Sequence, residues 1–174
     1  MKFVELTIPG ALRVIPERLE DSRGWFARTY DEEAFRARAL PTQWPHHNGS
    51  WNRRKGTLRG LHGVKPQFRE DKLVRCVRGR IWDVLVDMRS DSPAFLRWEA
   101  VELSGANSVA LYVPSGVFHG FQTLEDDSEV LYLMSDPYIP EAASGASWND
   151  PKLAISWPLS EPFLSERDRG YALL

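Results

Sequence analysis

Short runs of alternating side chains, separated by turn residues, occupy the middle of this 174-residue chain and restrict its fold most strongly. In the run from Ile81 to Met88, two sets of residues alternate and therefore face opposite sides of an extended chain. One set is Ile81, Asp83, Leu85 and Asp87, and the other is Trp82, Val84, Val86 and Met88. This period of two predicts a β-strand with two unlike faces. Turn residues bound the run, at Arg78–Arg80 before it and at Ser90–Pro93 after it.

Similar runs follow along the chain, at Leu96–Leu103, Val109–Val113, Phe121–Leu124 and Glu129–Met134. So many short strands between Thr57 and Tyr138 predict an all-β fold, with a double-stranded β-helix, the cupin-like jelly roll, as the leading candidate. Two short peripheral helices are expected. One covers Thr29–Leu40 and ends before Pro41, and the other begins after Ser165 as its N-cap.

The length and composition indicate one ordinary globular domain that spans residues 1–174, with 43% hydrophobic and 26% charged residues. A net charge of −2 makes a nucleic-acid partner unexpected. No run of about eighteen apolar residues suggests a membrane-spanning helix. Charged residues near Met1 also disfavour a secretory signal peptide.

Cys76 is the only cysteine, so no internal disulfide is possible, and this fits a cytoplasmic protein. It lies in the strand-like run Leu73–Val77, where a buried structural thiol is expected rather than a nucleophile.

The histidines bear on whether the chain binds a metal. The turn Val113–His119 resembles the second half of the metal motif of cupins, but the first half also needs a His-x-His pair, and Val64 stands two residues after His62. His46 and His47 are neighbours in an expected loop. Because a metal site needs three or four ligands, no metal site is expected.

A metal-free pocket with His62, Lys72 and Tyr132 suits proton transfer at a carbon beside a carbonyl group. A neutral imidazole is a competent base near pH 7. A tyrosine can return a proton, and a lysine can stabilise the enolate oxygen. Each residue also has a plain structural interpretation, as a strand histidine or a core tyrosine, so that only their joint occurrence favours catalysis.

Several ordered motifs occur together with characteristic spacing: Arg59–His62, Lys72–Arg75 with Gly79, Asp83–Arg89, Ser92–Pro93, Pro114–Phe121, Glu129–Tyr132 and Trp148–Pro151. Through these motifs, nearly the whole chain resembles the dTDP-4-dehydrorhamnose 3,5-epimerase family. The resemblance implies a jelly-roll homodimer that binds a nucleotide sugar and inverts C3, C5 or both without any cofactor.

The resemblance also implies residue roles. The catalytic set is His62 as base, Asp168 as its orienting partner, Lys72 for the enolate at the C4 oxygen, and Tyr132 as acid on the opposite face. Substrate contacts are expected from Arg23 at the diphosphate, Tyr138 at the nucleotide base, and Arg59, Asn48, Ser50, His119 and Arg167. The alternation of the strand, and not the resemblance, places Asp83 on the same face as Leu85, where it is expected to pair with Lys72 behind these residues.

Departures from the family pattern concern the substrate more than the chemistry. His46 takes a glutamine position, Gly63 and Val64 replace Tyr-Gln after the base, and Arg28 and Ala143 take acidic positions. Loss of the Tyr-Gln pair predicts a roomier pocket beside the base. Three alternatives therefore stay open: a single-position epimerase acting on another nucleotide sugar, a non-catalytic sugar-binding relative, and a metal cupin.

Overall fold

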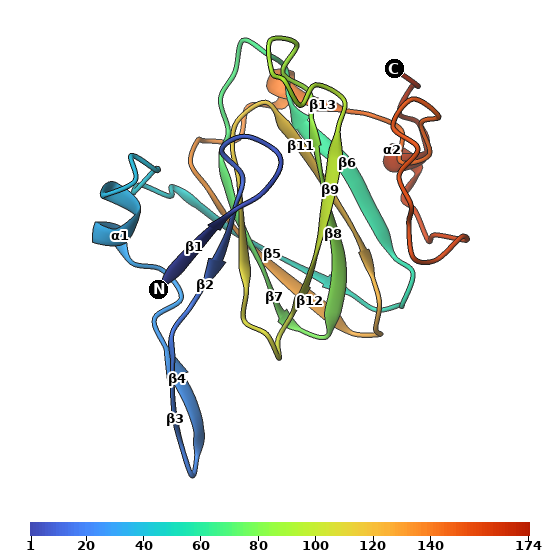
Figure 1. Cartoon of the computed structure of the whole chain (residues 1–174). Helices are drawn as coiled ribbons and strands as arrows, with labels where there is room; N and C mark the ends of the chain where they lie inside the picture. Colours follow the sequence, from blue (N-terminus) through green and yellow to red (C-terminus); the bar gives the residue numbers. More distant parts are fainter.

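Two antiparallel sheets face each other in the computed structural model, which describes residues 1–174 (Figure 1). One sheet has six strands in the order β1-β2-β10-β7-β12-β5, and the other has five in the order β13-β6-β11-β8-β9. The predicted all-β jelly roll is confirmed. The strands are β1 Lys2–Glu5, β2 Leu12–Ile15, β3 Arg18–Asp21, β4 Gly24–Ala27, β5 His46–Asn52, β6 Leu58–Val64, β7 Lys72–Arg78, β8 Arg80–Asp87, β9 Trp98–Ser104, β10 Ala110–Val113, β11 Val117–Thr123, β12 Ser128–Met134 and β13 Ala143–Gly145.

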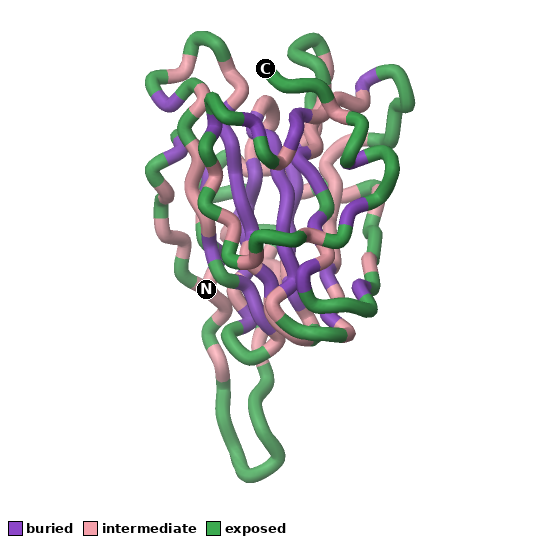
Figure 2. Tube along the Cα trace, turned by 90° about the vertical axis from the view of Figure 1, so that its right-hand side faces the viewer, coloured by how far each residue is buried: buried purple, intermediate pink, exposed green.

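The main core lies between the two sheets and explains the period-two pattern. On β8, Ile81 and Leu85 point into this core, while Val84 and Val86 point outward into a second apolar cluster that includes Leu153. Both faces of β8 are therefore buried, as Figure 2 shows for the central strands of the molecule. The burial of Cys76 in the main core confirms its expected structural position.

The helices are short and peripheral, as expected. Helix α1 covers only Glu32–Arg36, less than the predicted span. The Asp31 side chain caps its start by accepting a hydrogen bond from the Ala34 amide at 3.0 Å, and the positive φ of 54° at Ala39 stops the helix from reaching Leu40. Helix α2 covers Glu166–Arg169, and its predicted N-cap Ser165 is confirmed. A 3₁₀ turn, η1, at Pro140–Ala142 leads into β13.

Two regions differ from the prediction. His46 and His47 lie on β5, paired with β12, and not in a loop, because the backbone of residues 46–52 continues the ladder of the six-stranded sheet. Strands β1 to β4 were not predicted. Of these, β3 and β4 form a hairpin that projects from the body and is exposed along most of its length (Figures 1 and 2).

Candidate active site

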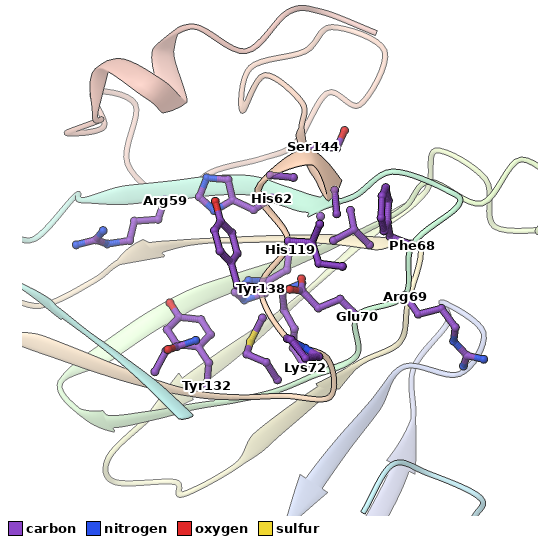
Figure 3. Close-up of a pocket in the computed structure, with 18 of the residues that line it drawn as sticks. Arg59, His62, Phe68, Arg69, Glu70, Lys72, His119, Tyr132, Tyr138 and Ser144 are labelled. Carbon is purple, nitrogen blue, oxygen red and sulfur yellow. The ribbon is translucent and has the colours of Figure 1, made fainter. Parts of the chain in front are cut away.

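A cavity of about 510 Å³ opens between the two sheets (Figure 3). Strands β6 and β11 supply its residues from one sheet, and strands β5, β7 and β12 supply them from the other. It brings together most of the predicted site residues: Asn48, Ser50, Arg59, His62, Lys72, His119, Tyr132, Tyr138 and Arg167.

The predicted His62–Asp168 pair is present in the structure. Asp168 Oδ1 lies 2.6 Å from His62 Nε2, and the Asp168 amide donates to the Ser165 hydroxyl at 3.1 Å. Burial alone would raise the pKa of Asp168, but hydrogen bonds from His62 and Ser165 and the charge of His62 outweigh it and hold that pKa below its ordinary value. A carboxylate at Nε2 favours the tautomer with its proton there, which leaves the lone pair on Nδ1 as the base.

A second histidine–carboxylate pair lies beside the first. His119 on β11 is the register partner of His62 on β6, and its Nε2 lies 2.8 Å from Asp83 Oδ2. The expected pair of Asp83 with Lys72 is wrong. Asp83 lies on β8, diagonally across from His119 in the five-stranded sheet, whereas Lys72 belongs to the six-stranded sheet.

Tyr132 occupies the facing wall of the cavity, on β12 of the six-stranded sheet. Its hydroxyl lies 3.4 Å from that of Ser50 on β5, and its ring centroid lies 6.2 Å from that of His119. Burial raises the pKa of the Tyr132 phenol well above its ordinary value, against the smaller opposing effect of the Ser50 hydrogen bond. A phenol is protonated at neutral pH even at its ordinary pKa, so Tyr132 holds a proton that it can donate.

Lys72 begins β7 at the cavity floor, and its side chain is only 8% exposed. Its partner is Glu70, which sequence reasoning missed. The Glu70 carboxylate accepts a hydrogen bond from Lys72 Nζ and also lines the cavity (Figure 3). A carboxylate two residues before a strand lysine lies on the same side of an extended chain, and this spacing could have revealed it.

The remaining expected binding residues lie around the mouth of the cavity. Arg59 Nε donates to the Asn52 side chain at 2.7 Å. Tyr138 is 62% exposed and free to stack on a flat ligand. Arg167, on α2, reaches the cavity from the C-terminal segment.

Arg23 does not line this cavity. It lies at the tip of the β3–β4 hairpin, where its side chain is 87% exposed and pairs with Asp21 at 2.6 Å. The hairpin extends away from the body of its own chain (Figure 1), so that the structure does not bring Arg23 together with the other predicted site residues.

The departures from the family pattern are spread over different places. Gly63 and Ala143 line the cavity, whereas Arg28 pairs with Asp31 on the surface at 2.6 Å. A Cβ on Gly63 would overlap the ring of Phe118, which belongs to the second apolar cluster and does not line the cavity. The roomier pocket beside the base therefore stays a prediction.

No three histidine, cysteine, aspartate or glutamate side chains come together in an arrangement that could hold a metal ion. Neither helix has the length and apolar character that crossing a bilayer requires.

Comparison with known proteins gives a consistent result. The family model described as dTDP-4-dehydrorhamnose 3,5-epimerase matches residues 5–174. A dTDP-4-dehydrorhamnose 3,5-epimerase from Sinorhizobium fredii is 38% identical over 169 residues, which cover 97% of this chain and 87% of the relative.

Two solved structures are also similar. The dTDP-4-dehydrorhamnose 3,5-epimerase from Bacillus anthracis, with TDP and PPi bound, has a TM-score of 0.96 at 37% identity and covers 99% of both chains. A 3′-monoepimerase from Streptomyces bikiniensis, in complex with dTDP-quinovose, has a TM-score of 0.89 at 34% identity, with 97% of this chain and 85% of that chain covered.

The jelly roll, with a histidine–aspartate pair facing a protonated tyrosine, defines an isomerase of the proton-transfer type. The chain belongs to the dTDP-4-dehydrorhamnose 3,5-epimerase family.

Proposed function

We propose that this protein epimerises a dTDP-linked 4-keto-6-deoxy sugar at C3 and C5, in the biosynthesis of a rhamnose-like deoxysugar. The observation that carries the proposal is the placement of His62 and Tyr132. They face one cavity from opposite sheets, so that a sugar ring between them presents one face to a base and the other to an acid (Figure 3).

The ketone at C4 makes the protons on C3 and C5 acidic, because the negative charge left by either proton spreads onto the C4 oxygen. His62 takes the proton, with Asp168 at 2.6 Å stabilising the imidazolium. The Lys72 ammonium stabilises the enolate oxygen. Tyr132 then delivers a proton to the opposite face of the same carbon, and the configuration inverts.

No electron is gained or lost in these steps, so that the chain's own acid, base and cation suffice without a cofactor. Arg59, Asn48, Ser50, His119 and Arg167 would bind the sugar and phosphates around the cavity. Tyr138 would stack on the nucleotide base. Asp83 would act through His119, whose orientation it fixes at 2.8 Å.

We also propose a homodimer in which residues 1–174 of each copy form one domain. The β3–β4 hairpin supports this proposal, because Leu19 and Phe26 are 65% and 72% exposed on an arm that projects from the body of the chain (Figure 1). In a dimer this arm would bury its apolar side chains and bring Arg23 to the diphosphate in the partner's site. A cytoplasmic location fits the single unpaired thiol of Cys76.

The test is incubation with dTDP-4-keto-6-deoxyglucose in deuterated water, with the label located by NMR. Deuterium at both C3 and C5 would support the 3,5-epimerase. The His62→Ala variant should incorporate none.

A single-position epimerase is the second candidate, and the similarity to the 3′-monoepimerase from Streptomyces bikiniensis favours it. Deuterium at one carbon only would select this candidate. Absence of label in the parent protein would contradict both, and would leave another nucleotide sugar or a non-catalytic sugar-binding role.

A further inference from the structure

We propose that Tyr171 is a positioning residue that fixes the His62 ring against Asp168 and orients Arg167 toward the cavity. This inference rests on the proposed function, because it concerns His62, the proposed base. Tyr171 itself does not line the cavity and lies behind the base.

The contact between the two rings is direct. The centroids of His62 and Tyr171 lie 5.8 Å apart at an interplanar angle of 64°, an edge-to-face arrangement. The bond to Asp168 fixes only one atom of an imidazole whose side chain is 36% exposed. A second contact on the ring is therefore needed to prevent it from turning about its Cβ–Cγ bond.

The Tyr171 hydroxyl also binds a residue that lines the cavity. Arg167 Nε donates to the Tyr171 hydroxyl at 2.9 Å. Arg167 and Asp168 are neighbours on α2, so that Tyr171 links the base to an arginine expected to bind substrate.

Gly145 provides the space for the Tyr171 ring. It lies on β13 directly opposite His62 on β6, and a Cβ at this position would overlap the phenol ring. The segment that carries Tyr171 is held in place nearby, because the Ser147 amide donates to the Ala172 carbonyl at 3.2 Å. The Tyr171 ring is thus held between Gly145, which has no side chain, and the ring of His62.

Three variants separate the two roles of Tyr171. Tyr171→Phe loses only the bond from Arg167, so that KM should rise about threefold while kcat stays within about twofold. Tyr171→Ala also frees the His62 ring, so that kcat should fall about tenfold, since small misplacements of a reacting group are costly. Gly145→Ala should reproduce this loss by displacing the ring.

The double variant Gly145→Ala/Tyr171→Ala tests whether the two changes act through one contact. Its kcat should be no lower than that of Tyr171→Ala alone, because there is no ring left to displace. Additive losses would overturn the proposal. Leu173→Ala, in the same segment and 60% exposed, is the matched control and should behave as the parent.

A second readout does not depend on the substrate. The imidazole N–H of His62 that faces Asp168 should exchange with solvent faster in Tyr171→Ala and in Gly145→Ala than in Leu173→Ala, as measured by ¹⁵N-histidine NMR. Unchanged exchange together with unchanged kcat would refute the positioning role. If the parent protein lacks activity, the proposed function fails, while the exchange measurement still decides the role of Tyr171.

Discussion

At the scale of single residues, three polar side chains of the cavity each have a carboxylate partner. His62 bonds to Asp168, His119 to Asp83, and Lys72 to Glu70. Pairing offsets the cost of burying a carboxylate, so that loss of one partner leaves the other without its hydrogen bond. Each pair therefore behaves as a unit when one member is changed.

Asp168→Asn should lower kcat by about a hundredfold or more, because a carboxamide no longer selects the tautomer that leaves His62 Nδ1 free. Steady-state kinetics against Glu166→Gln, an exposed change on the same helix, would measure the loss. A kcat within twofold of the parent would contradict the assigned dyad.

Asp168→Asn should also change how the free energy of unfolding depends on pH. The pKa of Asp168 lies below its ordinary value in the folded protein, so that its carboxylate stabilises the fold above about pH 4. This contribution disappears as the pH falls through the lowered pKa of Asp168 in the folded protein. The difference in free energy of unfolding between parent and Asp168→Asn should therefore shrink below pH 4 in urea titrations.

At the scale of elements, α2 presents two site residues to β6 although it has only one turn. Its stability depends on the Ser165 cap, because a helix of this length has almost no internal hydrogen bonds. Ser165→Ala should lower the free energy of unfolding by about 1 kcal/mol and also reduce kcat. Ser165→Thr should restore both, since threonine also caps helices and keeps the hydroxyl group beside Asp168. Equal kcat in all three proteins would show that the cap does not position Asp168.

The sequence allowed the strands of the core to be predicted, because residues such as Ile81 and Leu85 alternate with the period of the sheet. The β3–β4 hairpin was missed, since its exposed strands have no buried face to impose that period. Glu70, the partner of Lys72, was missed although it lies only two residues away. The partner of Asp83 was misassigned for another reason: its pair with His119 depends on which strands lie side by side, and strand order is not contained in local spacing.

At the scale of the whole molecule, the projecting hairpin suggests that one chain is not the complete enzyme. Phe26→Glu should weaken self-association, because it places a charge among apolar side chains that a dimer would bury. Sedimentation velocity should then detect more monomer, and KM for the nucleotide sugar should rise as Arg23 leaves the partner's site. Phe163→Glu, at an exposed aromatic of the C-terminal segment, is the control. Unchanged sedimentation would contradict a dimer formed through the hairpin.

The bond between His62 and Asp168 joins residues that are 106 positions apart. Asp168 lies on a one-turn helix outside both sheets, and a helix this short is stable only when it packs against structure that has already formed. A refolding molecule can therefore assemble both sheets and their core before its base acquires a partner. Recovery of catalysis would then follow recovery of the native fluorescence, and enzymatic activity would report the last step of folding.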